Sequence, residues 1–350
     1  MCPQKIGIAM SGGVDSTVTA LLLREQGYDV HGFFMCLPVA ESEQQIRRVR
    51  EIAATIDIDL ELVDMRDQFS GKIIRYFIKQ YTQGKTPNPC VICNKTIKFG
   101  VLLETMLSRG MDKGATGHYA RINHEPAGGY HLLRGLDPKK DQSYFLCRLQ
   151  QQQLANIVFP LGSWKKQDVY AKAESLGLTG FSGNESQDVC FLSTGLQEFL
   201  ARQGVEEKIG EICSLDGRML GHHSGISHYT IGQRRGLGLP DATPWYVVGL
   251  DPENNRVLVG KNDDLFTKRI IIHDLQWTDP ELDLPRQCLV QLRSRHTPAG
   301  ARLEQTGENN WLISCSEPQR AVTPGQFAVF YEEQRVVGSG VITGAETSRP

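Results

Sequence analysis

Ala9-Met10-Ser11-Gly12-Gly13-Val14-Asp15-Ser16 is a short polar turn that follows an apolar run and precedes a helical pattern. The apolar run over residues 5–10 predicts a buried strand, and residues 17–26 have the spacing of a helix. A strand, a glycine-rich turn and a helix N-terminus together form an anion site, because backbone N–H groups and the helix dipole point toward the same place. The two glycines let a phosphate approach the backbone closely, and the Asp and Ser side chains suit a helix cap or a phosphate-bound Mg²⁺ ion.

This turn differs from two common nucleotide-binding turns. It lacks the Lys of the Gly-Lys-Ser/Thr ending in nucleotide hydrolases, and it lacks the Gly-x-Gly-x-x-Gly spacing of dinucleotide-binding proteins. Ser-Gly-Gly-Val-Asp-Ser instead resembles the pyrophosphate loop of ATP pyrophosphatases, which split ATP between its α and β phosphates and leave AMP on an oxygen of the substrate. The alternative is a glycine-rich turn that binds no ligand.

Composition and charge narrow the class of protein. The 350 residues exceed the length of one typical domain and predict two or three domains. A net charge of −2 creates no global basic field, so any contact with RNA must come from local basic patches. No apolar run approaches the roughly 20 residues of a membrane span, and the first residues lack an apolar signal region. We therefore expect a cytoplasmic protein with no membrane partner.

Strands and helices alternate over residues 1–120, which is typical of an α/β fold with a doubly wound parallel sheet. The predicted strands cover residues 5–10, 28–36, 60–63 and 115–119, and the predicted helices cover residues 17–26, 41–56, 69–81 and 97–107. In such sheets ligands bind beyond the carboxyl ends of the strands, where the glycine-rich turn and Met35 both fall.

The pattern changes after Ala120. Residues 120–136 predict a β-hairpin, and residues 163–176 predict a helix. From about residue 204, short alternating runs separated by turn residues replace the helical periodicity, at 245–250, 256–259, 288–292 and 327–331. These runs favour one or two small β domains. We expect the domains to cover residues 1–200, 201–270 and 271–350.

Nine cysteines in a chain without a signal region favour metal-binding or catalytic thiols over a disulfide scaffold. Cys90 and Cys93 form a Cys-x-x-Cys pair, which two nearby prolines predict to lie in a loop between helices. Such a pair fits a redox couple, half of a zinc site, part of an iron–sulfur site, or two structural thiols. A zinc site would need a second pair of ligands, and none follows at standard spacing.

Cys190 is a second candidate thiol. Polar residues run up to it from Gly183, and an apolar strand begins directly after it. A thiol at a strand edge that faces polar groups can be a thiolate nucleophile. The alternative is a small buried apolar residue.

Seven motifs together resemble the bacterial tRNA 2-thiouridylases, and they occur in the same order over nearly the whole chain. They lie at residues 11–16, 88–94, 115–121, 140–146, 186–191, 232–238 and 323–326. The resemblance implies an N-terminal ATP pyrophosphatase domain of the adenine nucleotide alpha hydrolase type. A small central tRNA-binding domain and a C-terminal β-barrel would follow.

The resemblance also implies site residues. The residues that would bind ATP are Ala9, Met10, Ser11, Gly12, Gly13, Val14, Asp15, Ser16, Met35 and Gly117. Cys190 would carry a persulfide, Cys93 would be its partner thiol, and Asp15 would be required for adenylation. The residues that would face the target base are Asn88, Pro89 and Cys90. The residues that would contact tRNA are His118, Lys140, Asp141, Gln142, Arg293, Ser294 and Gln326.

The implied activity is the thiolation of the uridine at the first anticodon position of Lys, Glu and Gln tRNAs. ATP, with Mg²⁺, would adenylate the uracil O2, and sulfur from the cysteine persulfide would replace that oxygen. A persulfide sulfur-carrier protein would be the donor, and the enzyme would be a monomer.

One residue departs from the family pattern, in which the position of Cys90 is often Asp. A carboxylate at this position therefore cannot be essential here, or its role has moved to another residue. The change also creates three candidate ligands, Cys90, Cys93 and Cys190, for an iron–sulfur cluster that would deliver sulfide instead. Two other classes remain open: a pyrophosphate-loop enzyme that acts on a small molecule, and a non-catalytic RNA-binding or sulfur-carrier protein.

Overall fold

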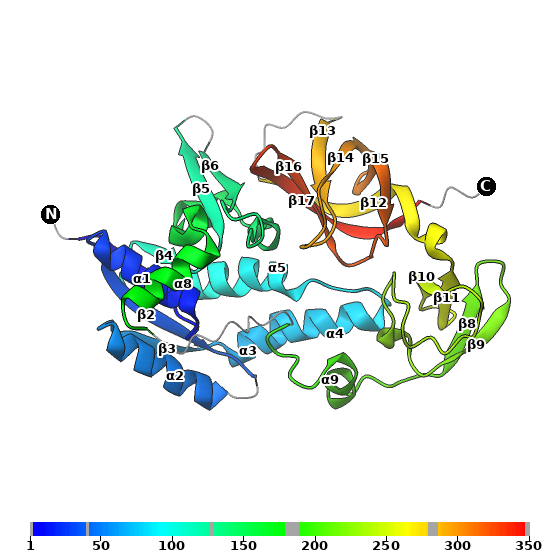
Figure 1. The fold of residues 1–350 in the computed structure, drawn as a ribbon, viewed down its shortest axis with the longest axis horizontal. Coiled ribbons are helices and arrows are strands. Elements are labelled where there is room, and N and C mark those ends of the chain that lie inside the picture. Colours follow the sequence, from blue (N-terminus) through cyan, green and yellow to red (C-terminus); the bar gives the residue numbers. More distant parts are fainter. Residues whose placement is uncertain (1–2, 40–41, 127–128, 179–188, 279–285, 347–350) are drawn as a thin grey trace.

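The computed structural model describes residues 3–39, 42–126, 129–178, 189–278 and 286–346. An α/β unit lies at one end of the elongated molecule, a small β unit lies at the other, and a β-barrel covers one side of the helices between them (Figure 1). No helix among the described residues is long and apolar enough to cross a membrane.

A five-stranded parallel sheet forms the core of the α/β unit, which confirms the predicted fold class. The sheet order is β3-β2-β1-β4-β7, and every neighbouring pair is parallel. The strands are β1 (Lys5–Ala9), β2 (Asp29–Cys36), β3 (Leu60–Asp64), β4 (Lys113–Ala115) and β7 (Ile157–Val158). The strand order reverses between β1 and β4, so the carboxyl ends of these two strands border the crevice in which ligands bind in such sheets.

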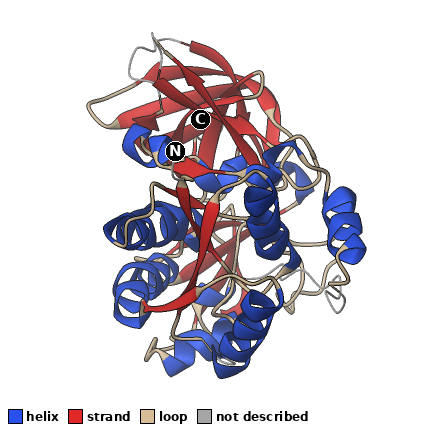
Figure 2. Cartoon of the chain, turned by 90° about the vertical axis from the view of Figure 1, so that its left-hand side faces the viewer, coloured by secondary structure: helices blue, strands red, loops and turns tan. Residues whose placement is uncertain are grey.

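Helices cover both faces of this sheet (Figure 2). On one face, α1 (Val14–Glu25) and α2 (Ser42–Thr55) pack against the side chains of Ile8, Val30 and Phe34. Two helical rods that join α- and π-helical segments cover the other face, where Phe33 points. The first rod contains α3 (Arg66–Phe69), the π-helical segment Ser70–Ile74 and α4 (Arg75–Thr82). The second rod contains α5 (Pro89–Cys93), the π-helical segment Asn94–Leu102 and α6 (Leu103–Ser108).

Three local predictions are wrong in this unit, and one of them is the apolar strand after Cys190, where residues 190–191 form a turn and no strand of the described residues follows before Gly210. The second rod begins at Pro89 and not near residue 97, so the Cys-x-x-Cys pair lies in the first helical turn and not in a loop. Asn88 caps this helix by accepting a 3.3 Å hydrogen bond from the N–H of Val91. Pro89 suits the first helical position because an N–H at that position would have no acceptor within the helix. The fourth strand ends at Ala115 and not at residue 119.

The predicted hairpin is confirmed as β5 (Ala120–Glu125) and β6 (Gly129–Arg134). It does not join the parallel sheet. Instead β6 pairs with β17 (Arg335–Ala345) of the barrel, so the hairpin extends a sheet built from the far end of the chain. The segments after the hairpin are α7 (Gln151–Ala155) and α8 (Lys166–Ser175), with short 3-10 turns at Ser143–Leu146 and Pro160–Ser163.

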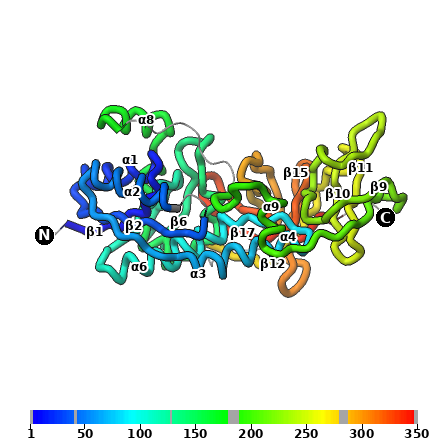
Figure 3. Tube along the Cα trace, turned by 90° about the horizontal axis from the view of Figure 1, so that it is seen from below, coloured from blue at the N-terminus to red at the C-terminus, as the bar shows by residue number. Residues whose placement is uncertain are grey.

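The small β unit follows α9 (Leu196–Arg202) and has the strand order β10-β11-β8-β9. Its strands are β8 (Gly210–Ser214), β9 (Met219–His223), β10 (Tyr246–Asp251) and β11 (Arg256–Gly260), with 3-10 turns at Ile226–His228 and Asn262–Leu265. In the view from below, α9 lies beside α4 (Figure 3), and the Phe77 and Phe199 rings of these helices are 5.9 Å apart.

The C-terminal barrel is closed by pairing of its first strand, β12, with its last strand, β17. Around the barrel the order is β12-β15-β14-β13-β16-β17. The strands not yet bounded are β12 (Phe266–Trp277), β13 (Arg286–Gln291), β14 (Ala299–Gln305), β15 (Asn310–Arg320) and β16 (Phe327–Glu332). Closure leaves no free edge among these strands, and the predicted barrel is confirmed.

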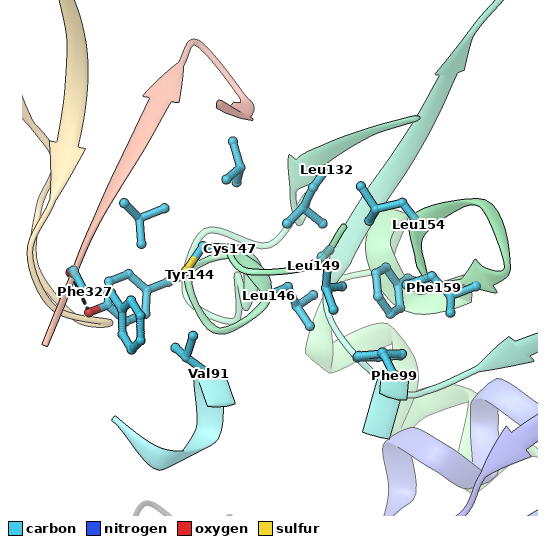
Figure 4. Close-up of a cluster of buried hydrophobic side chains, with 14 of the residues drawn as sticks. Val91, Phe99, Leu132, Tyr144, Leu146, Cys147, Leu149, Leu154, Phe159 and Phe327 are labelled. Atoms are coloured by element: carbon cyan, nitrogen blue, oxygen red, sulfur yellow. Dashed lines mark hydrogen bonds between the residues drawn. The ribbon is translucent and has the colours of Figure 1, made fainter. Parts of the chain in front are cut away.

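One hydrophobic core joins the second rod, the hairpin region and the barrel (Figure 4). Val91 and Phe99 of the rod, Tyr144 between them and the barrel, and Phe327 of β16 belong to this core. The Tyr144 hydroxyl donates a 2.9 Å hydrogen bond to the Phe327 carbonyl, which satisfies the polar atom of a fully buried ring. The helix that carries the thiol pair is therefore held by the barrel as well as by the α/β unit.

Candidate active site

The glycine-rich turn lies between β1 and α1 and leaves the helix N-terminus available to an anion. Gly12 has φ +76°, which glycine adopts without strain. Ser16 Oγ accepts a 3.2 Å hydrogen bond from the Ser11 N–H and donates a 3.0 Å one to the Gly13 carbonyl, so the turn is folded upon itself. No side chain caps α1, and the N–H groups of its first turn have no acceptor within the helix.

Gly117 touches this turn from the segment after β4. A Cβ atom at Gly117 would lie 2.9 Å from the carbonyl carbon and Cβ of Asp15 and 3.0 Å from the Ser16 nitrogen. Only glycine fits there without a shift of backbone. Met35, a second predicted ATP residue, lies half-buried near the carboxyl end of β2 and thus at the same edge of the sheet.

Asp15 is held by two residues that the motifs alone did not identify. The Lys166 ammonium lies 2.8 Å from each carboxylate oxygen, and the Tyr119 hydroxyl donates a 2.7 Å hydrogen bond to Oδ1. The Lys166 side chain is only 9 % exposed, whereas that of Asp15 is 33 % exposed. Lys166 stands in the first turn of α8, where the helix dipole disfavours a cation. That placement is the one sequence signal that could have indicated its pairing.

The segment around Cys190 packs against the first rod. The Phe191 ring is 5.7 Å from Phe69, 5.0 Å from Phe77 and 5.3 Å from Phe199, measured between ring centroids. These contacts fix the backbone beside Cys190, which is itself exposed. Residues 186–188 of the predicted motif lie outside the described residues.

The thiols of Cys90, Cys93 and Cys190 lie close enough for their charges to affect one another. Cys90 is exposed and Cys93 is half-buried. The pKa of Cys93 is raised to about 12, mainly by burial; the charge of Lys98 acts to lower it, and the charges of Cys190 and Cys90 act to raise it. Burial also raises the pKa of Cys90 and of Cys190, because protein atoms crowd the sulfurs although each residue has an exposed side.

These thiols do not assemble a metal site. Within the described part of the chain, no three His, Cys, Asp or Glu side chains lie close enough to hold a metal ion. The donor set that Cys90, Cys93 and Cys190 would supply to an iron–sulfur cluster therefore does not fit the group in this conformation.

The residues predicted to face the target base surround the start of α5. The Asn88 side chain is 8 % exposed and is occupied as the helix cap, and Pro89 is buried beside it. Of the three, Cys90 presents its side chain to solvent.

Most residues predicted to contact tRNA are engaged within the protein. The His118 ring packs 5.7 Å from Phe99 and 5.8 Å from Phe159, and its Nδ1 lies 2.7 Å from Thr116 Oγ1. Burial holds the pKa of His118 well below its ordinary value, with a smaller contribution from Lys98, so the imidazole is neutral. A charged contact with phosphate is not available to this ring.

The turn at residues 140–142 supports the glycine-rich turn through Tyr119. The Asp141 carboxylate accepts hydrogen bonds from Arg134 Nη1 at 2.9 Å and from the Ser143 N–H and Oγ at 3.0 Å. Gln142 Oε1 accepts a 2.9 Å hydrogen bond from the Tyr119 N–H and so steadies the residue that holds Asp15. Lys140 is half-buried in the same turn.

The remaining predicted tRNA residues lie where the three parts of the molecule meet. Arg293 donates to the carbonyls of Ala321 at 2.7 Å and Ile231 at 3.4 Å, and Ser294 is half-buried beside it. Gln326 Nε2 donates a 2.8 Å hydrogen bond to the Thr86 carbonyl, two residues before the cap of α5. The barrel thus contacts the segment that leads into the thiol helix.

Comparisons with known proteins match the chain as three successive domains. Three family models match in succession: a tRNA methyl transferase HUP domain over residues 4–194, a tRNA methyl transferase PRC-barrel domain over 197–261 and an aminomethyltransferase beta-barrel domain over 267–342. The tRNA-specific 2-thiouridylase MnmA of Desulfotalea psychrophila is 48 % identical over 339 residues, covering 96 % of this chain and 98 % of that protein. The protein of the same name from Syntrophomonas wolfei is 43 % identical over 342 residues, covering 97 % and 99 %. The chain belongs to the tRNA-specific 2-thiouridylase family.

Proposed function

We propose that this chain is an ATP-dependent tRNA 2-thiouridylase that acts on the uridine at the first anticodon position of Lys, Glu and Gln tRNAs in the cytoplasm. One juxtaposition carries the proposal. A pyrophosphate loop with a buried ammonium at its aspartate belongs to the same α/β unit as three thiols that affect one another electrostatically. The first group suits adenylation of an oxygen, and the second suits delivery of sulfur.

Adenylation is the first half of the reaction. The uracil O2 attacks the α-phosphorus of ATP, pyrophosphate leaves, and N3 loses its proton. The free N–H groups of α1 and the Lys166 ammonium can offset the negative charge of the phosphates. Asp15 and Ser16 offer the hard oxygen ligands that fit Mg²⁺, which would neutralise phosphate charge when bound with ATP.

Sulfur transfer is the second half. The Cys93 thiolate attacks Cys190 Sγ of the persulfide, the sulfur–sulfur bond breaks, and hydrosulfide leaves with the electron pair. Hydrosulfide attacks C2 of the adenylated uridine, AMP leaves with O2, and the sulfur's proton returns to N3. The Cys93–Cys190 disulfide is then reduced by an external dithiol. A persulfide-bearing carrier protein recharges Cys190, and we propose that the enzyme works as a monomer.

The decisive experiment is mass spectrometry of nucleosides from tRNA incubated with enzyme, ATP, Mg²⁺ and a persulfide donor. We expect 2-thiouridine with the wild-type enzyme, and none with Cys190→Ala or Cys93→Ala. Both variants should retain tRNA-dependent pyrophosphate release. Cys288→Ala, on barrel strand β13, is the matched control and should behave as the wild type.

The rival interpretations give different results in the same assay. A small-molecule ligase would release pyrophosphate without tRNA, and a non-catalytic binding protein would release none. Full thiolation by Cys190→Ala would contradict the persulfide role. A brown, iron-containing enzyme after anaerobic purification would favour cluster chemistry, whereas the persulfide mechanism predicts a colourless and active one.

A further inference from the structure

The second rod changes its helical geometry directly after the thiol pair. Cys93 and Lys98 are five positions apart, and the segment Asn94–Leu102 that contains Lys98 is π-helical. In an α-helix, positions five apart point about 140° away from each other. In a π-helix the hydrogen bonds connect residues five apart, so such positions share one face, and π-helical turns recur at functional sites. This geometry places Lys98 one turn beyond Cys93 on the same side of the rod.

Lys98 is the one cation whose charge affects all three thiols, Cys90, Cys93 and Cys190, among the described residues. Its charge acts on Cys90, Cys93 and Cys190, lowering the pKa of each against the larger effect of burial. The charged groups that act on these sulfurs are Lys98 and the thiols themselves, and no carboxylate of the described residues acts on them. The buried His118 nearby is neutral and supplies no second positive charge.

The position of Lys98 on the rod is fixed by its neighbours. Ile97 and Phe99 are 0 % and 3 % exposed and belong to two separate hydrophobic cores, whereas Lys98 between them is half-buried. Among the described residues, Lys98 has no hydrogen bond or ion pair with another side chain, in contrast to Lys95, whose Nζ donates to Gln276 at 3.0 Å. Its ammonium is thus available to a charge that arises during the reaction.

We propose that Lys98 is a positioning residue of sulfur transfer, whose ammonium stabilises the negative sulfur on Cys93 and the hydrosulfide expelled from Cys190. The inference rests on the proposed function, because that reaction is what generates negative sulfur at this place. Burial disfavours the negative form of Cys93, and the positive charge of Lys98 acts against that effect, which favours attack on the persulfide. Among the described residues, Lys98 has no hydrogen bond or ion pair with the glycine-rich turn, so we assign it to the second half-reaction alone.

The test compares Lys98→Met, Lys98→Arg and the control Lys79→Met, which removes an exposed lysine of α4. Because a neighbouring opposite charge typically changes the equilibrium between thiol and thiolate by about tenfold or more, we expect Lys98→Met to slow 2-thiouridine formation by a similar factor. Its tRNA-dependent pyrophosphate release should equal that of the wild type. Lys98→Arg should restore most of the thiolation, and Lys79→Met should change neither reaction.

A second readout does not depend on turnover. The rate of iodoacetamide alkylation at Cys93, followed by peptide mass spectrometry against pH, reports the thiolate directly. We expect this rate, compared at one pH below the Cys93 pKa, to fall about tenfold or more in Lys98→Met and to stay near the wild-type value in Lys98→Arg. An unchanged alkylation rate in Lys98→Met overturns the proposal, as does loss of pyrophosphate release together with thiolation. If the wild type formed no 2-thiouridine, the proposed function would fail while the alkylation profile would still decide the electrostatic role of Lys98.

Discussion

Replacing Lys166 with Met tests the ion pair at the pyrophosphate loop. The substitution removes the ammonium that lies 2.8 Å from both oxygens of Asp15, and it retains most of the side-chain volume. Breaking a buried pair typically costs 3–5 kcal/mol. Here the Asp15 side chain is one-third exposed and keeps its hydrogen bond from Tyr119, so water and the hydroxyl replace part of the loss. We expect a cost of about 1–3 kcal/mol, or a melting temperature roughly 2–10 °C lower.

The effect on adenylation should be larger than the effect on stability. If the ammonium offsets phosphate charge, its removal should slow tRNA-dependent pyrophosphate release about 10²- to 10³-fold. The control is Lys172→Met on the same helix, which removes a surface pair with Glu25 at 2.6 Å. That pair is worth about 0–1 kcal/mol, so both melting and activity should remain near the wild type. Wild-type pyrophosphate release by Lys166→Met at saturating ATP would refute the role assigned to this lysine.

Three further predictions concern the other parts of the site. Gly117→Ala should abolish pyrophosphate release while calorimetry still shows a folded protein, because the added methyl group meets the Asp15 backbone at 2.9 Å; normal release would show that the turn can move away. The pKa of Cys93, raised by burial to about 12 from 9.0, predicts stability that is full below about pH 9 and declines toward pH 12, since only the unfolded thiol ionises freely there. Urea titrations should show a smaller decline for Cys93→Ala, and parallel curves would contradict the burial. Exposed Arg234 and Arg235 would bind phosphates, so replacing both with Ala should make the slope of log affinity for tRNA against log salt shallower by about 1–2, whereas an unchanged slope would exclude them from the interface.

Local signals were sufficient for the parts of the fold that local chemistry determines. The strand, turn and helix around residues 5–25 follow from apolar periodicity and two glycines, and the parallel sheet follows from the alternation of such segments. The hairpin and the strands β10, β11, β13 and β16 were likewise predictable from alternation and turn residues, whereas the other four barrel strands were not among the predicted runs. The sequence also indicated which cysteines are candidate reactive thiols, because only the Cys90–Cys93 pair and Cys190 have proline-rich or polar surroundings.

The missed features depend on contacts between distant residues. Lys166 is 151 positions from Asp15, and nothing in its own helix identifies that partner. The start of α5 at Pro89 depends on a cap by Asn88, whose side chain could equally have remained in a loop. The π-helical segment after Cys93 has no residue pattern that distinguishes it from an α-helix, and its buried side chains belong to two separate hydrophobic cores. The pairing of β6 with β17 joins positions about 200 residues apart, and periodicity carries no information on such pairing.

The core that joins the thiol helix to the barrel has a consequence for how the enzyme can be divided. Val91 and Phe99 pack in one cluster with Phe327 and Tyr331, so deleting the barrel would uncover apolar surface on the helix that carries Cys90 and Cys93. A fragment that ends after the small β unit would therefore lose the order of its thiols even if its nucleotide half stayed folded. The two halves of the proposed site consequently differ in what holds them: the residues around the glycine-rich turn belong to the first unit alone, whereas the order of the thiols depends on the barrel as well.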